Sequence, residues 1–268
     1  MVEKNLEYLS RQIKFTGFGE DHEEELKQKM ERLLPEFQIT HDAGFGTDLL
    51  EATLNFRKST ESGMYFFNSY HATLKKGHQP SPVEHTFYVN SRENSITLKE
   101  AYNLLSGRCV YKEFTAKAGN KYRAWLQMDF KQTDLHGNYK LRQYHQNYGF
   151  DLLTTLSRHP IKELMDEAST KRLLESLQKG NRQVITLDMK GQEQRVYIEA
   201  VPQFKSLNFY DSSLQRLKTD RLYEQDIPLT PAPQWNEDRL RAPLQVHGDP
   251  SGMTSEEKNY SRNKISIS

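Results

Sequence analysis

Residues 96–130 read ITLKEAYNLLSGRCVYKEFTAKAGNKYRAWLQMDF, and this stretch decides the predicted fold. Thr97 and Glu100 have the spacing of a capping box, in which each side chain pairs with the other residue's backbone N–H. A helix that begins there ends at Gly107, because glycine readily adopts the left-handed conformation that closes a helix. After a turn at residues 118–120, apolar and polar side chains alternate with the period of a strand. The stretch therefore predicts a helix followed by a β-hairpin.

The alternation in the second strand assigns its side chains to two faces. The apolar face is predicted to hold Tyr122, Ala124, Leu126, Met128 and Phe130. The opposite face is predicted to hold Arg123, Trp125, Gln127 and Asp129. On this pattern Trp125 points away from the core, because successive side chains of a strand point to opposite faces.

A weaker version of the same pattern begins at Leu173. A short apolar stripe (Leu173, Leu174, Leu177) precedes Gly180, and residues 184–188, 196–200 and 204–210 can form strands. We interpret residues 96–212 as two helix-plus-β-hairpin units and thus as a possible internal repeat. The alternative is that an α+β domain contains this order of elements without any duplication.

The N-terminal residues predict a helix pair followed by an antiparallel meander. Apolar stripes indicate one helix with Leu6, Leu9 and Ile13, and a second with Leu26, Met30, Leu33 and Leu34. Period-two patterns joined by short turns then fill residues 36–90, and they predict that Met64, Phe66, Asn68, Tyr70, Ala72 and Leu74 share one face. The predicted fold class is α+β, with the helix pair packed on the meander.

The predicted domain organisation has three parts. Residues 1–95 form the helix pair and sheet, residues 96–212 form the two helix-plus-hairpin units, and residues 213–268 form a mostly disordered tail. The tail is predicted because aliphatic residues become rare and prolines stand at 228, 231, 233, 243 and 250. Residues 131–149 are polar and nearly lack aliphatic side chains, which predicts a loop or a weak helix.

The composition limits the classes of function. The formal net charge is +1, so the whole chain is not a polycation that coats nucleic acid. Cys109 is the single cysteine, which excludes an internal disulfide and a multi-cysteine zinc site. Neither a signal peptide nor a run of about 18 apolar residues is present, so we expect a cytoplasmic protein with no membrane contact.

No motif of a known catalytic, cofactor or metal site appears in the sequence. The acidic run EDHEEE at residues 20–25 could hold a metal through His22, but carboxylates at the positive end of a helix dipole explain it fully. Cys109 has no nearby partner that would mark a nucleophile, so we expect a buried structural thiol. The sequence therefore predicts no cofactor, no metal and no enzyme activity, although an enzyme with an unfamiliar site remains an alternative.

The segment 108–148 mixes cations with aromatic rings. Cations hold phosphates and flat rings stack on bases, which is the chemistry of a single-strand-binding surface. The candidate residues are Arg108, Lys112, Lys121, Arg123, Trp125, Lys131, Tyr139, Lys140, Arg142 and Tyr144. The alternative is a solvated sheet face whose Trp125 packs under a neighbouring helix.

Five runs of the sequence carry a resemblance to known proteins. They are LEYLSRQIKFTGFGE, LNFRKSTESGMYFFNSY, the residues 96–134 that contain KAGNKYRAWLQMDFKQTD, HQNYG, and EAVPQFKSLNFYD. Over residues 5–216 the chain resembles a family of uncharacterised proteins encoded on conjugative and other mobile elements of Bacteroides-type bacteria, with a helix-plus-hairpin domain of unknown function. The resemblance implies an accessory role around DNA. We therefore expect a non-enzymatic protein that binds single-stranded DNA or RNA weakly; the alternative is an adaptor that binds a protein encoded on the same element, without nucleic-acid contact.

Overall fold

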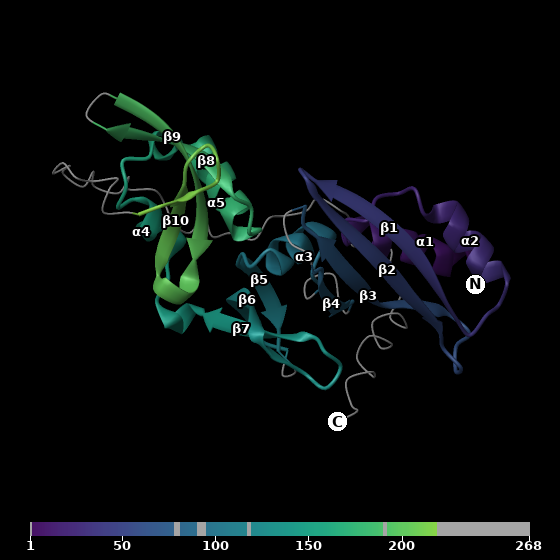
Figure 1. Cartoon of the computed structure of the whole chain (residues 1–268). Coiled ribbons are helices and arrows are strands. Elements are labelled where there is room, and N and C mark those ends of the chain that lie inside the picture. Colours follow the sequence, from purple (N-terminus) through teal and green to yellow (C-terminus); the bar gives the residue numbers. More distant parts are fainter. Residues whose placement is uncertain (1, 78–80, 90–94, 117–118, 190–191, 219–268) are drawn as a thin grey trace. The chain divides into compact units, whose positions relative to one another are not determined.

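The structure is a computed structural model that describes residues 2–77, 81–89, 95–116, 119–189 and 192–218. All of the described residues belong to one compact unit. The described chain has five α-helices and three antiparallel sheets, so the predicted α+β class is confirmed (Figure 1). None of its helices has both the length and the apolar character needed to cross a membrane.

The first part of the chain is a helix pair and a four-stranded meander. Its elements are α1 (Val2–Phe15), α2 (Glu23–Glu31), β1 (Glu36–Phe45), β2 (Asp48–Lys58), β3 (Tyr65–Lys75) and β4 (Val83–Tyr88), with the strands in the order β1-β2-β3-β4. Helix α1 contacts β3 and α2 contacts β1. Leu9, Ile13, Leu26 and Met30 are buried in the same core as the inward side chains of the sheet.

Two details of this part differ from the prediction. Helix α2 ends at Glu31, and Leu33 has a left-handed backbone (φ 54°), so Leu33 and Leu34 are exposed rather than part of the apolar stripe. In β3, a β-bulge breaks the period of two, because Asn55 pairs with Ser69 while Phe56 pairs with Phe67.

The extra residue of this bulge is Asn68. Tyr65 and Phe67 are therefore buried before the bulge, whereas Phe66, predicted on the inner face, is only partly buried. After the bulge, Tyr70 resumes the predicted inner face.

The second part begins with α3 (Leu98–Leu105). Thr97 Oγ1 accepts the N–H of Glu100 (3.3 Å), and the Glu100 carboxylate accepts the N–H of Thr97 (2.8 Å), which confirms the predicted capping box. Gly107 closes the helix with φ +86°. The three-stranded sheet that follows has the order β5-β6-β7, with β5 (Val110–Thr115), β6 (Lys121–Thr133) and β7 (Tyr139–His145).

Strand β7 corrects the prediction of a loop or weak helix at 131–149. Its inward residues, Tyr139 and Leu141, pack against the main core, and the strand pairs with β6. Two apolar side chains among many polar ones are too few for a recognisable alternation. The turn before β6 is described at Ala116, whose N–H donates to Asn120 (2.8 Å), whereas residue 118 lies outside the described residues.

The third part contains two α-helices and a third meander. Its elements are η1 (Gln146–Tyr148), α4 (Leu152–Leu156), η2 (Lys162–Met165), α5 (Glu167–Gln178), β8 (Gln183–Met189), β9 (Gln192–Val201), η3 (Pro202–Phe204), β10 (Ser206–Tyr210) and β11 (Arg216–Leu217), where η marks a 3₁₀ helix. Strand β11 lies inside residues 213–268, which were predicted to be mostly disordered, so the start of that prediction is wrong. The Asp211 carboxylate accepts N–H groups of Ser213 and Gln215, and this turn brings β11 back onto β10. The remainder of that tail, residues 219–268, lies outside the described residues.

The ends of α3 and α5 have the same local geometry. The N–H of Arg108 donates to Asn103 O (2.9 Å), and the N–H of Asn181 donates to Ser176 O (3.1 Å). Each residue follows a glycine with positive φ, and each helix leads into an antiparallel meander. The units are thus a helix plus three or four strands rather than a helix plus hairpin, and their origin by duplication stays a prediction.

The buried core crosses the predicted domain boundary at residue 95. Leu104, Val110, Leu126 and Met128 belong to the same apolar cluster as the first sheet. The buried side chains of residues 152–209 lie outside that cluster. The cluster therefore takes in only part of β6, because the buried Trp125 of the same strand lies outside it.

The buried His85 of β4 predicts acid sensitivity. Burial, which outweighs the opposing Asp134, lowers the pKa of His85 to about 4. The folded pKa lies below the unfolded value of about 6.5, so its stabilising contribution is complete above pH 6.5 and is lost as the pH falls toward 4. We expect a loss of up to about 3 kcal/mol in the free energy of unfolding across this window.

Urea unfolding at pH 7 and pH 5 measures this effect. His85→Phe keeps an aromatic ring against Phe87, whose centroid lies 4.5 Å from that of His85. This variant should lose less stability between the two pH values than the natural chain does. His71→Phe, a more exposed histidine of β3, is the control. Equal pH dependence of the His85 variant and the natural chain would contradict the prediction.

Candidate nucleic-acid interface

The structure brings six of the ten predicted interface residues to one face of the β5–β7 sheet. Cross-strand pairs lie on the same face of a sheet, and the register pairs Tyr144 with Trp125 and Arg142 with Gln127. The six residues are Lys121, Arg123, Trp125, Lys140, Arg142 and Tyr144. The remaining four, Arg108, Lys112, Lys131 and Tyr139, lie elsewhere.

Trp125 is not available for stacking on a base. It is 4% exposed. The Phe150 ring packs edge-on against it at 5.5 Å, and the Tyr111 ring lies at 5.1 Å. The prediction that the Trp125 ring is exposed is therefore wrong. The residue that covers it, Phe150, lies just before α4 and 25 positions further along the chain.

Arg108 and Lys112 are engaged inside the protein. Arg108 Nε donates to Gly180 O (3.0 Å), and one terminal nitrogen donates to Asn103 Oδ1 (2.5 Å). Lys112 forms an ion pair with Glu100 (2.7 Å), and both side chains are largely buried. Both cations therefore join α3 to its neighbours and lie apart from the shared face of the sheet, and their contact with nucleic acid stays a prediction.

Three of these six residues, all of them cations, form ion pairs with carboxylates. Lys121 (3.1 Å) and Arg123 (3.0 Å) both contact Glu113, and hydrogen bonding to these cations lowers the pKa of Glu113. Arg142 contacts Asp129 at 2.6 Å, and this hydrogen bond lowers the pKa of Asp129. These pairs leave less positive charge for phosphates than the sequence indicates.

Tyr139 and Phe130 exchange their predicted environments. Tyr139 packs against the core, and Phe130, predicted on the apolar face, is 43% exposed. Their rings meet edge-on at 5.1 Å. Lys131 is exposed next to Phe130.

A different group of side chains has the chemistry that was predicted for Trp125. The Tyr144 and Tyr148 rings lie 4.9 Å apart, and Tyr148 is 39% exposed. Lys205 Nζ, at the end of η3, lies 5.1 Å from the Tyr148 ring centroid. We define the Tyr148 surface as Lys140, Arg142, Tyr144, Tyr148 and Lys205.

Lys205 is held by an unusual backbone conformation. Its φ of 50° and ψ of 42° are left-handed, which is unfavourable for a side chain with a Cβ, and this conformation ends η3. The Tyr148 hydroxyl donates to Gln203 O (2.8 Å) and so joins η1 to η3. Tyr148 ends the predicted 108–148 segment, whereas Lys205 was not predicted, because it stands 57 positions from Tyr148 and the sequence has no signal that joins them.

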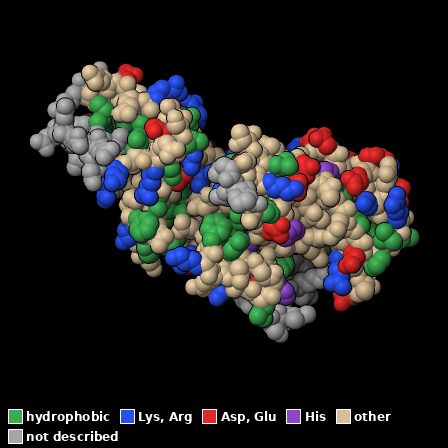
Figure 2. All heavy atoms as spheres, in the orientation of Figure 1, with side chains coloured by type: hydrophobic (Ala, Val, Ile, Leu, Met, Phe, Trp, Pro, Cys, Tyr) green, Lys and Arg blue, Asp and Glu red, His purple; other side chains and the backbone are tan. Residues whose placement is uncertain are grey.

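Charge is distributed unevenly along the chain. Residues 1–95 contain more Asp and Glu than Lys and Arg, and residues 96–218 contain more Lys and Arg. On the face shown in Figure 2, carboxylates gather mainly over the first sheet and its helices, and Lys and Arg are more common over the part with β8–β10. A small net charge therefore conceals a basic C-terminal part of the described chain.

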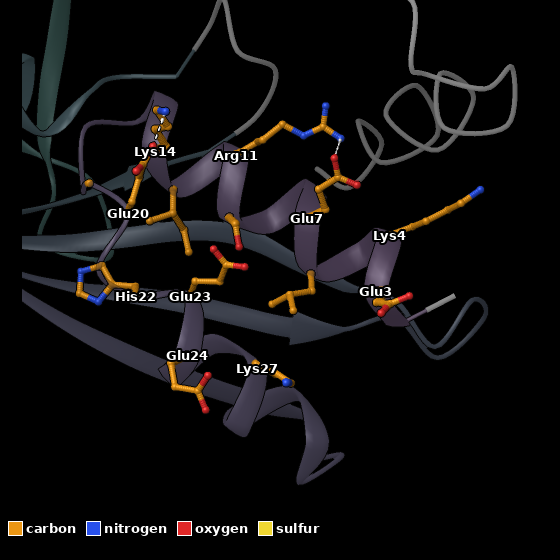
Figure 3. A pocket seen from close by; sticks show the side chains of 14 residues that line it. Glu3, Lys4, Glu7, Arg11, Lys14, Glu20, His22, Glu23, Glu24 and Lys27 are labelled. Carbon is orange, nitrogen blue, oxygen red and sulfur yellow. Dashed lines mark ion pairs between the residues drawn. The ribbon is translucent and has the colours of Figure 1, made fainter.

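An open groove of about 920 Å³ lies along α1 and α2. Its charges are mixed, with Lys4, Arg11, Lys14 and Lys27 among five glutamates. Figure 3 shows two of these cations in ion pairs, Arg11 with Glu7 (3.1 Å) and Lys14 with Glu20. The groove thus offers no single charge that would select a ligand.

The other groups considered from the sequence are Cys109, His22 and a possible metal site. Cys109 is buried, as predicted, and burial raises its pKa to about 12, so the thiol stays protonated. His22 Nε2 contacts His41 Nδ1 at 2.9 Å. Within the described residues no three His, Cys, Asp or Glu side chains gather as a metal-binding group.

Comparisons with known proteins were made at the level of both sequence and structure. No protein-family model, curated protein or solved structure matches this chain. The resemblance to mobile-element proteins therefore stays a prediction, and the functional argument rests on the Tyr148 surface itself.

Proposed function

We propose that this protein is a non-enzymatic, cytoplasmic accessory protein of a mobile element that binds single-stranded nucleic acid weakly through the Tyr148 surface. The observation that carries the proposal is the pair of adjoining tyrosine rings, one of them 39% exposed, between basic side chains. Exposed rings stack on bases of any sequence, and cations beside them attract phosphates. The mobile-element role comes from the resemblance of the sequence alone.

The contacts of the Tyr148 surface support weak rather than tight binding. Arg142 is shared with Asp129. Among the described residues Lys140 and Lys205 have no ion-pair partner, so they supply most of the available charge. Few phosphate contacts give an affinity that falls as salt is added, but with a shallow slope.

Removal of the Tyr148 ring is expected to weaken binding. Base–aromatic stacking contributes about 1–3 kcal/mol per ring, so Tyr148→Ala should lower affinity for a fluorescent oligothymidine by about tenfold or more. Fluorescence anisotropy at low and moderate salt measures this. Tyr148→Phe keeps the ring and should bind nearly as the natural chain does.

Tyr88→Ala is the matched control, because Tyr88 is an exposed tyrosine on β4. It should not change the affinity. Equal affinity of Tyr148→Ala, Tyr88→Ala and the natural chain would contradict the proposal.

The alternative is an adaptor that binds a protein by adding a strand to a sheet edge. The edge of β8 is occupied, because the Glu163 carboxylate accepts the N–H of Thr186 (3.0 Å) and Pro160 O accepts that of Asp188 (2.9 Å). Strand β1 is an edge strand of the first sheet. Salt distinguishes the two functions, since strand addition responds little to added salt and phosphate binding weakens.

A further inference from the structure

Four basic side chains from three segments lie around α3 and its C-terminal end. Lys76 follows β3, Lys99 and Arg108 belong to α3 and its end, and Arg182 precedes β8. None of them belongs to the Tyr148 surface. Only Arg108 was singled out from the sequence.

The Tyr102 ring lies next to two of these cations, Lys99 and Arg108. Lys99 Nζ is 5.0 Å and Arg108 Cζ 4.9 Å from the centroid of its ring. The ring stacks on Phe45 at 4.1 Å with an interplanar angle of 14°. Its hydroxyl donates to Asp48 Oδ2 (3.2 Å), which brings the start of β2 to the group.

Lys76 precedes α3 in the sequence and Arg182 follows it, so the two side chains come from distant segments. Lys75 pairs with Leu49, which places Lys76 beside Asp48. Arg108 Nε donates to Gly180 O (3.0 Å), two residues before Arg182. The Arg182 guanidinium lies 4.2 Å from the Tyr210 ring centroid and contacts Glu199 at 3.3 Å.

The positive charge of this group is not balanced by its carboxylates. Asp48 accepts the Tyr102 hydroxyl, and Glu199 accepts Arg182, Asn208 and Tyr210. Among the described residues neither Lys76 nor Lys99 has an ion-pair partner. The buried Nε of Arg182 has no hydrogen-bond partner in the described chain either.

The cations also repel one another. Burial lowers the pKa of Lys76 and of Arg108, and Arg182 lowers both further. Partial burial and the charge of Arg108 lower the pKa of Lys99 as well. Like charges in a partly buried site are unfavourable, and a bound anion removes this cost.

We propose that Lys76, Lys99, Arg108 and Arg182 form a binding site for a phosphate group. Guanidinium groups donate paired hydrogen bonds to phosphate oxygens, and ammonium groups add charge without a fixed geometry. The ligand is a small phosphorylated compound or a phosphate of a nucleic-acid strand. The site is independent of the proposed stacking at Tyr148.

Calorimetric titration of the full chain with sodium pyrophosphate at constant ionic strength tests the site. Hydrogen bonds to charged groups are strong enough for each lost ammonium to weaken binding about tenfold. The double variant Lys76→Gln/Lys99→Gln should therefore bind far more weakly. Lys4→Gln/Lys27→Gln, which removes two exposed lysines of the α1–α2 groove, should bind as the natural chain does.

Stability without phosphate gives a second measurement. The Lys76→Gln/Lys99→Gln variant relieves repulsion, so its unfolding midpoint in phosphate-free buffer should be equal or higher, whereas lysines with a structural role would lower it. No binding of pyrophosphate by the natural chain, or equal binding by all three proteins, would overturn the proposal.

Binding of a labelled oligothymidine to the same proteins shows whether the phosphate belongs to a nucleic-acid strand or to a small compound. Displacement of the labelled oligonucleotide by pyrophosphate, with weaker oligonucleotide binding by the double variant, assigns the site to a nucleic-acid strand. Pyrophosphate binding without displacement assigns it to a small phosphorylated compound. Tyr148→Ala should leave pyrophosphate binding unchanged, so failure at one site is separable from failure at the other.

Discussion

Trp125→Ala should lower the free energy of unfolding by about 3–5 kcal/mol, the usual cost of removing a large buried ring. Trp125 is 4% exposed and is covered on the outer face of its sheet by Phe150 and Tyr111. Its removal leaves a cavity between β5, β6 and the segment that leads into α4. Urea unfolding followed by circular dichroism measures the loss.

The same variant tests the location of the stacking surface. At a temperature where Trp125→Ala is still folded, it should bind oligothymidine nearly as the natural chain does, because Tyr148 is unchanged. Phe204→Ala, which removes a 70% exposed ring, is the control for stability and should shift the unfolding midpoint little. Unchanged stability together with lost binding would return the stacking role to Trp125.

Signals that lie within a few residues of one another predicted much of the fold. The spacing of Thr97 and Glu100 located the start of α3, and Gly107 located its end. The alternation in β6 correctly buried Leu126 and Met128. Each of these features depends on the backbone conformation of a single element, so local residue types are sufficient to specify it.

The errors arise where distant segments meet. Phe150 covers Trp125 from a later segment, and nothing in the period of β6 indicates this cover. The bulge at Asn68 depends on the pairing of β3 with β2. The contact of Lys205 with Tyr148 depends on a turn in another sheet. Such contacts follow from the packing of elements against one another, which the local pattern of residue types does not indicate.

Gly180→Ala should lower the free energy of unfolding by about 2–5 kcal/mol. The left-handed conformation of Gly180 (φ +80°) costs a residue with a Cβ about 1–2 kcal/mol. A Cβ there would also stand 2.7 Å from Cys109 O and 3.0 Å from Asn103 Cβ. Overpacking of this kind adds about 1–3 kcal/mol, because the ends of α3 and α5 must separate.

Gly137→Ala isolates the steric part of this loss. Gly137 has the same φ of +80°, but a Cβ there meets nothing within 4 Å. Its replacement should cost only the conformational part, about 1–2 kcal/mol. The excess loss in Gly180→Ala then measures the close packing of the two helix ends, where Arg108 also donates to Gly180 O. Equal losses in the two variants would mean that α3 and α5 do not meet in solution at this glycine.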